Sequence, residues 1–138
     1  MRSDGIVNTC LKEPITEEVA DGRYSLHAVL VTTADGISIY LGGGESPHIG
    51  TVVISQPRPS LRGDGQISCT TSVFNLIAHK DDSLAIPLAE ELCKKHKQVV
   101  VVTAGVHIDN AEENDIARLG RNSAALAAKL MARMVNKV

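Results

Sequence analysis

The order of its secondary-structure patterns restricts the fold of this chain more than any other feature of the sequence. Four strand-like segments precede the first helical pattern, at residues 23–33, 37–41, 51–55 and 66–73. A helical pattern at residues 83–97, a fifth strand at residues 99–103 and further helical patterns follow. Strands grouped ahead of helices are typical of α+β domains. We therefore expect residues 1–138 to form one two-layer α+β domain, a mostly antiparallel β-sheet with helices packed on one face.

Local signals set the expected ends of these elements. Asp35-Gly36 predicts a hairpin turn, because this pair accepts positive φ. The segment Pro57-Arg58-Pro59-Ser60 lacks two amide hydrogens, so we expect the preceding strand to end before it. Pro87 is best tolerated in the first turn of a helix, so that helix should begin near residues 84–86.

The two ends of the chain carry weaker patterns. Residues 1–22 are irregular in pattern, with one possible helical turn at residues 16–19. Asn110 fits the N-cap of a helix, which we expect to be interrupted around Gly120. Asn122 would then cap the last helix.

Composition excludes several classes of function. The chain has 14 basic and 16 acidic residues, a net charge of −2, which is a poor match for a phosphate backbone. Two tyrosines and one phenylalanine leave almost nothing on which nucleic-acid bases could stack. The longest apolar runs fall far below the roughly 20 residues of a membrane span. Three cysteines without CxxC spacing, and no signal-like apolar stretch, favour a reduced cytoplasmic protein.

Two segments have the residue types of an anion site. Gly42-Gly43-Gly44 can turn backbone amides toward an anion if it forms a loop, and His48 follows closely. Arg58 lies between two prolines, which lowers the entropy lost when its guanidinium is held on a phosphate or carboxylate. A flexible hairpin loop and an edge-strand stop are the structural alternatives for these two segments.

Histidines follow two of the expected strands. His79 and Lys80 come after the fourth strand, and His107 precedes Asp109 and Asn110 after the fifth. The aspartates and the asparagine could simply cap the following helices. Histidine and carboxylate are also metal ligands, so a metal site would use the candidates His48, His79, His107 and Asp109. No local ligand motif accompanies them, so this reading requires the segments to converge.

Five segments resemble, in the same order, the signature segments of the LpdD-like proteins, which are encoded beside UbiD-type decarboxylases. They are Pro47-His48-Ile49-Gly50, Pro57-Arg58-Pro59-Ser60-Leu61, Thr71-Ser72-Val73, His79-Lys80-Asp81 and Val106-His107-Ile108-Asp109-Asn110-Ala111. The resemblance implies a prenylated-flavin chaperone-like protein. Such a protein is non-catalytic and binds, matures or delivers prenylated FMN, or a similar phosphorylated cofactor, for a UbiD-type decarboxylase.

The residues can be matched to such a cofactor on chemical grounds. FMN offers a phosphate dianion, which the glycines, His48 and Arg58 could hold. Its ribityl hydroxyls and ring edges could bond Thr71, Ser72, Asp109 and Asn110. The full expected binding set is Gly42, Gly43, Gly44, His48, Arg58, Ser60, Thr71, Ser72, His79, Lys80, His107, Asp109 and Asn110.

Two other functions remain open at this point. One is a metal-dependent or acid–base enzyme acting on a small molecule, with the histidines as ligands or proton carriers. The other is a structural or regulatory subunit without a small-molecule site. Because a sheet covered on one face leaves exposed edges, we also expect a homo-oligomer.

Overall fold

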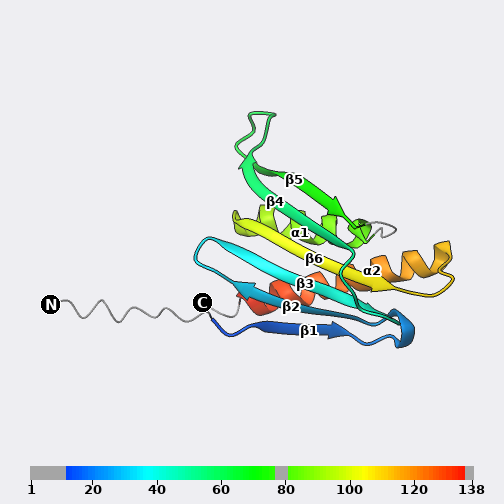
Figure 1. The fold of residues 1–138 in the computed structure, drawn as a ribbon. Coiled ribbons are helices and arrows are strands. Elements are labelled where there is room, and N and C mark those ends of the chain that lie inside the picture. The colour runs from blue at the N-terminus through cyan, green and yellow to red at the C-terminus, as the bar shows by residue number, and fades with distance from the viewer. Residues whose placement is uncertain (1–11, 77–80, 136–138) are drawn as a thin grey trace.

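The computed structural model describes residues 12–76 and 81–135. Its elements, shown in Figure 1, are β1 (Ile15–Val19), the short 3₁₀ helix η2 (Gly22–Tyr24), β2 (Leu26–Thr32), β3 (Gly36–Gly44), β4 (Thr51–Pro59), β5 (Ile67–Asn75), α1 (Asp82–His96), β6 (Val99–His107) and α2 (Glu113–Val135). Strands precede helices as the sequence predicted, and the α+β class is confirmed. No helix in these residues is long and apolar enough to cross a membrane.

The six strands form one sheet in the order β1-β2-β3-β6-β4-β5. Neighbouring strands are antiparallel except β3 and β6, which run parallel at the centre. β2 and β3 pair as the hairpin expected from Asp35-Gly36. The chain therefore passes from β3 through β4, β5 and α1 before β6 pairs with β3.

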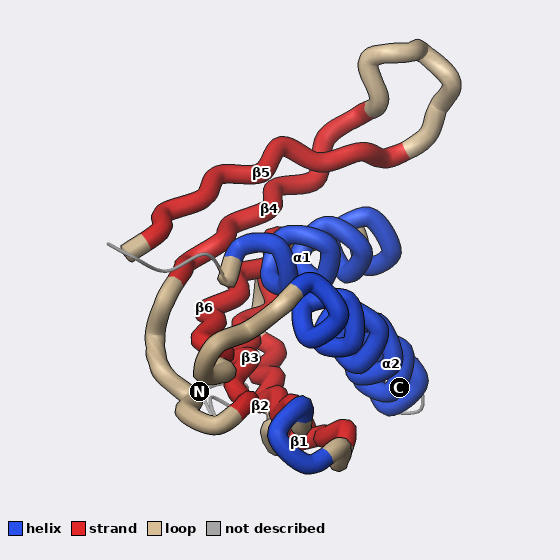
Figure 2. The backbone as a smooth tube through the Cα atoms, turned by 90° about the vertical axis from the view of Figure 1, so that its right-hand side faces the viewer, coloured by secondary structure: helices blue, strands red, loops and turns tan. Residues whose placement is uncertain are grey.

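Both helices pack against the same face of the sheet, as Figure 2 shows, so this prediction is confirmed. Burial alternates along β2: Leu26, Ala28 and Leu30 are buried, whereas His27 and Val29 are exposed. This alternation is the pattern of a strand with one covered face. Fully buried side chains from both layers form the core, among them Leu26, Leu30, Ile39, Leu41, Val53, Val100, Val102, Leu92, Leu126 and Leu130.

The prediction that β4 would end before its prolines is wrong. β4 continues to Pro59 and pairs with β5 along its whole length, but it pairs with β6 only as far as Ser55. The bond from the Ser60 amide to the Gln66 carbonyl shows that the even-numbered residues of β4 direct their backbone N–H and C=O groups toward β5. The backbone nitrogens of Pro57 and Pro59 therefore point to the β6 side of the strand. β6 no longer pairs with β4 there, so no ladder hydrogen bond is lost.

The three consecutive glycines do not form the expected loop. Gly42, Gly43 and Gly44 are the last residues of β3, and the Gly44 amide donates to the Ser25 carbonyl at 2.9 Å. A Cβ on Gly44 would overlap the carbonyl oxygen of His107, and its φ is +72°. Close backbone approach at the end of the strand, rather than loop flexibility, requires glycine here.

Both helices are more continuous than predicted. α1 begins at Asp82, and Pro87 lies inside it. The bond that Pro87 cannot make would end on the carbonyl of Ser83, an exposed residue that water can reach. α2 runs without interruption through Gly120, and Asn122 does not cap a helix.

Part of the segment expected to be irregular is a strand. β1 occupies residues 15–19, where one helical turn was expected, and it forms the edge beside β2. Lys129 and Arg133 of α2 donate to the carbonyl oxygens of Glu18 and Thr16. These two bonds join residues more than a hundred positions apart in sequence and add to the pairing of β1 with β2.

Candidate functional site

The candidate site lies where the two parallel central strands end. Gly44 of β3 and His107 of β6 are register partners, and the Glu45 amide donates to the His107 carbonyl at 2.7 Å. Carboxyl ends of neighbouring parallel strands are a common place for ligands in sheets of this kind. The segments that leave these strands, residues 45–50 and 108–112, therefore lie side by side.

The backbone of His48 is fixed on the end of β6. Its amide donates to the Gly105 carbonyl at 3.3 Å, and the Tyr40 hydroxyl donates to the His48 carbonyl at 2.9 Å. Gly105 has no room for a Cβ, which would overlap that same carbonyl oxygen. Burial, followed by the negative charge of Asp81, raises the pKa of Tyr40 and keeps its hydroxyl a donor.

The side chain of His48 faces a buried carboxylate. Its Nε2 lies 3.3 Å from Oδ2 of Asp81, and the two side chains are 23% and 8% exposed. The Val106 amide donates to the other oxygen, Oδ1, at 3.1 Å. Asp81 Oδ2 is buried without a hydrogen bond. The approach of His48 is thus not a hydrogen bond, and one carboxylate oxygen is left unsatisfied, which is uncommon in protein interiors.

A second histidine–aspartate pair lies beside the first. His107 Nε2 is 2.8 Å from Asp109 Oδ1, and these side chains are 50% and 73% exposed. The rings of His48 and His107 meet edge to face, with their centroids 6.4 Å apart. We call these four residues, His48, Asp81, His107 and Asp109, the His–Asp cluster. It runs from a buried carboxylate to an exposed one.

Two residues that the sequence analysis did not select complete the surroundings. Glu45 Oε1 accepts the Asp109 amide at 2.8 Å, and Arg23 Nη2 donates to the Asp109 carbonyl at 2.9 Å. Arg23 and Glu45 lie 3.5 Å apart as an ion pair. Glu45 follows the glycines directly, which was a usable signal. Arg23 is 86 residues from Asp109 in sequence, so nothing local marks it.

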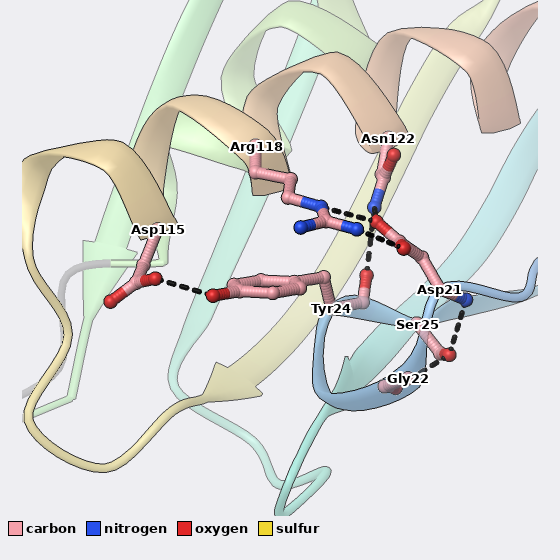
Figure 3. Close-up of polar contacts among 7 residues, drawn as sticks. All are labelled: Asp21, Gly22, Tyr24, Ser25, Asp115, Arg118 and Asn122. Carbon is pink, nitrogen blue, oxygen red and sulfur yellow. Dashed lines mark hydrogen bonds and ion pairs between the residues drawn. The ribbon is translucent and has the colours of Figure 1, made fainter.

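A polar network next to Arg23 holds η2 on α2 (Figure 3). Arg118 donates to both carboxylate oxygens of Asp21 and lies over the Tyr24 ring, 4.4 Å from its centroid. Asn122 donates to Asp21 and to the Tyr24 carbonyl, and the Tyr24 hydroxyl donates to Asp115 at 2.6 Å. This network fixes the segment from which Arg23 reaches the candidate site.

The network also shifts the ionisation of its members. Hydrogen bonds from Arg118 and then Asn122 lower the pKa of Asp21. The bond from Tyr24 lowers the pKa of Asp115, and the same bond raises the pKa of Tyr24. Both carboxylates are therefore held as anions in the folded chain.

The structure brings about half of the expected binding residues together. Those at or next to the site are Gly42, Gly43, Gly44, His48, His107, Asp109 and Asn110. His79 and Lys80 lie outside the described residues. The amide of Gly44 is used by Ser25 and the glycines belong to a paired strand, so this geometry offers no amide nest for a phosphate.

Arg58 and Ser60 lie at the far end of the β4–β5 hairpin, which projects from the sheet in Figure 1. Arg58 is seven residues along β4 from Thr51, roughly 23 Å at about 3.3 Å per residue. Its Nε donates to Thr70 Oγ1 at 2.9 Å, and Ser60 Oγ accepts the Arg62 amide at 3.2 Å. These two residues do not meet the His–Asp cluster.

The two hydroxyl residues of β5 point to opposite faces. Thr71 donates to Glu90 of α1 at 2.6 Å and lies 2.8 Å from the Ser55 hydroxyl, so it joins the strand to the helix. Ser72 is exposed on the other face. Neither is in contact with the His–Asp cluster.

The metal hypothesis gains no support from the geometry. In residues 12–76 and 81–135, no group of three or more histidine, cysteine, aspartate or glutamate side chains is arranged to hold a metal ion. His48 and His107 each turn Nε2 toward a different aspartate instead. His79, the remaining candidate ligand, lies outside these residues.

Comparison with known proteins places the fold and the family. The chain is similar to a chain in the crystal structure of a chaperone complex for yeast 20S proteasome assembly, with a TM-score of 0.56 at 15% sequence identity. The match covers 90% of this chain and 95% of that one, and it supports the fold alone. No curated protein matches the sequence. The sequence profile of the prenylated flavin chaperone LpdD-like domain matches residues 20–135. This match covers most of the chain and shows that the chain belongs to the prenylated flavin chaperone LpdD-like domain family.

Proposed function

We propose that this chain is a non-catalytic accessory protein that binds prenylated FMN and delivers it to a UbiD-type decarboxylase. Membership of the family supports the cofactor. The observation that carries the location is the His–Asp cluster, because signature segments far apart in sequence supply all four of its residues. We also place the protein in the cytoplasm, where the free thiols of Cys69 and Cys93 stay reduced.

The charges of the site indicate which part of the cofactor it holds. Glu45, Asp81 and Asp109 supply three carboxylates, against one guanidinium from Arg23. Such a set repels a phosphate dianion unless both histidines are protonated. Carboxylates and imidazoles instead accept hydrogen bonds from hydroxyl and ring N–H groups. We therefore assign the cluster to the ribityl chain and the N–H edge of the flavin ring.

The exposure of the site fits a cofactor that is handed on. His107 and Asp109 are open to solvent, whereas Asp81 lies behind His48. A ligand bound on the open pair loses less contact with water than one in a closed cavity, so its release requires less rearrangement. The buried pair keeps the two loops in place while the ligand comes and goes.

Flavin titration of the full chain tests the assignment. We expect FMN or prenylated FMN to bind, and His107→Ala and Asp109→Asn each to weaken binding at least tenfold, about 1.4 kcal/mol. His27→Ala is the matched control: Nδ1 of this exposed histidine lies 3.0 Å from a carboxylate oxygen of Glu18, outside the cluster, and its loss should leave affinity within twofold. Lack of flavin binding by the wild-type chain, alone and with the decarboxylase, would refute the proposal.

Flavin titration of Arg58→Ala tests whether the β4–β5 hairpin holds the phosphate of the cofactor. A loss of affinity in this variant, with none in His107→Ala, would move the binding site to the hairpin and contradict our assignment. Losses in both variants would require a second copy or the partner to bring the hairpin to the cluster, because the two lie too far apart within one chain to hold one phosphate.

Two paired histidines and aspartates are also an arrangement for proton transfer, so an acid–base enzyme is the second candidate. Decarboxylase already loaded with prenylated FMN separates the two functions. The accessory role predicts full activity of the loaded enzyme without this chain, and activation of apo-enzyme that depends on His107. An enzymatic role predicts that the loaded decarboxylase still requires the chain. A purely structural subunit predicts that His48→Ala and His107→Ala have no effect on activation.

A further inference from the structure

The two edge strands of the sheet, β1 and β5, differ in length and in charge. β1 is five residues long, contains Glu17 and Glu18, and has carbonyl groups that accept bonds from Lys129 and Arg133 of α2. β5 at the opposite edge is nine residues long, Ile67–Asn75, and contains neither a charged residue nor a proline. Charges, prolines and short length are the usual protection against edge-to-edge pairing. β5 has none of these.

The free side of β5 offers regularly spaced backbone groups. All residues of β5 have a register partner on β4, and the bonds from Ser60 N to Gln66 O and from Leu76 N to Gly50 O show that the even-numbered residues direct their N–H and C=O groups toward β4. Odd-numbered residues therefore direct their N–H and C=O groups away from the sheet. Within the described part of the chain, none of these outward groups forms a hydrogen bond. The residues that carry these outward groups are Ile67, Cys69, Thr71, Val73 and Asn75.

Apolar side chains accompany this edge on both faces. Phe74 is 68% exposed on the face that the helices leave open, and Val73 is exposed on the other. Ile54 of β4 and Leu76 extend the same surface. Exposed apolar groups next to an unpaired edge are characteristic of a surface that another chain covers.

We propose that β5 pairs antiparallel with β5 of a second copy of this chain, about a two-fold axis at Thr71. This register aligns all nine residues, with Cys69 opposite Val73 and Ile67 opposite Asn75. Every pair formed by two odd-numbered residues is then a hydrogen-bonded pair, so the register uses the outward groups that β5 leaves free. Two six-stranded sheets would join into one continuous sheet.

The absence of charge favours a second copy as the partner. An interface with two-fold symmetry places each residue near its own symmetry mate, so a charged residue near the axis would meet a like charge. Nine consecutive uncharged residues meet this requirement, with Thr70 opposite Ser72 on the open face. A partner recognised by charge would instead need charged residues on β5. The inference does not depend on flavin binding.

The mass of the full chain in solution tests the pairing. Size-exclusion chromatography with light scattering should give twice 14.7 kDa for the wild type. Ser72→Lys should give 14.7 kDa with an unchanged circular-dichroism spectrum, because the two introduced cations would lie about 7–8 Å apart across the axis. Ser38→Lys is the matched control: Ser38 is exposed on the same face but belongs to β3, so the dimer should persist.

Hydrogen exchange provides a second measurement. The amides of Cys69, Thr71 and Val73 should be protected in the wild type and exchange at least a hundredfold faster in Ser72→Lys. A monomeric wild type at 100 μM would overturn the proposal, and so would binding of β5 only to another protein. Dissociation by Ser38→Lys but not by Ser72→Lys would also overturn it, since the open faces would then pack together instead of the edges.

Discussion

Gly105 sets the position of His48, the central residue of the candidate site. The loop from residue 45 to 50 crosses β6 at this glycine, and its backbone approaches closer than any side chain would allow. The Tyr40 hydroxyl donates a hydrogen bond to the same carbonyl group of His48, and the Asp81 carboxylate faces the imidazole. Gly105 of β6, Tyr40 of β3 and Asp81, which directly precedes α1, thus determine where this imidazole lies.

Gly105→Ala should destabilise the chain by about 1–3 kcal/mol, the usual cost of forcing an extra methyl group into a packed position. The new Cβ meets backbone atoms of His48 and Ile49, which cannot rotate away as a flexible side chain can. Urea denaturation measures the change in the free energy of unfolding. An unchanged midpoint would mean that the loop does not cross β6 at this residue.

Flavin affinity of the same variant should fall together with stability, because the methyl group displaces His48 from Asp81. His107→Ala offers the comparison, since His107 is exposed and its removal should reduce binding while leaving the unfolding midpoint nearly unchanged.

At the scale of elements, the β4–β5 hairpin and α2 both continue past residues that usually end such elements. The hairpin passes Pro57 and Pro59 because their missing amides face a side without a neighbouring strand. α2 passes Gly120 because Leu119, Ser123, Leu126 and Ala127 around it are buried against the rest of the fold. Packing therefore outweighs the local preference of these residues.

Gly120→Ala should stabilise the chain by roughly 1 kcal/mol, the difference in helix propensity between the two residues. A Cβ at Gly120 meets no atom within 4 Å, and the residue is exposed inside a helix. Thermal unfolding followed by circular dichroism measures the change. A lower melting temperature would indicate that α2 is broken at this point, as the sequence alone had predicted.

At the scale of the whole molecule, contacts between distant parts of the chain close the fold. The network of Asp21, Tyr24, Arg118 and Asn122 joins the segment before β2 to α2, across about a hundred residues. Arg133 of the same helix forms an ion pair with Glu17 of β1. α2 therefore holds β1 and, through η2, the position of Arg23 near the candidate site.

The network predicts a dependence of stability on pH. The pKa of Asp21 lies below its ordinary value of 3.8, so its contribution is complete above about pH 5 and is lost as the pH falls through the lowered value. The melting temperature of wild type should thus exceed that of Arg118→Ala at pH 7, and the difference should shrink toward pH 3. Arg62→Ala, in the exposed turn of the β4–β5 hairpin, also removes one guanidinium; it is the control and should show little difference at either pH. A gap between wild type and Arg118→Ala that is constant from pH 7 to pH 3 would show that the ion pair does not form.

The sequence by itself determined the elements that repeat a short pattern. Alternating apolar residues predicted β2, the Asp35-Gly36 turn predicted its hairpin with β3, and leucines four apart predicted α1. The signature segments around His48 and His107 also predicted the family, which the profile match confirms. Each of these signals is local, since it depends on side-chain direction and backbone preference within a few residues.

Only the tertiary structure decided which of the polar segments meet. The parallel pairing of β3 and β6 brings Gly44 beside His107, and the same sheet carries Arg58 to the other end of β4. Strand order depends on which apolar faces can be buried together, and this information is distributed over the whole chain. For that reason the Asp21–Arg118 network and the approach of Asp81 to His48 could not be predicted from local sequence, although they position the site.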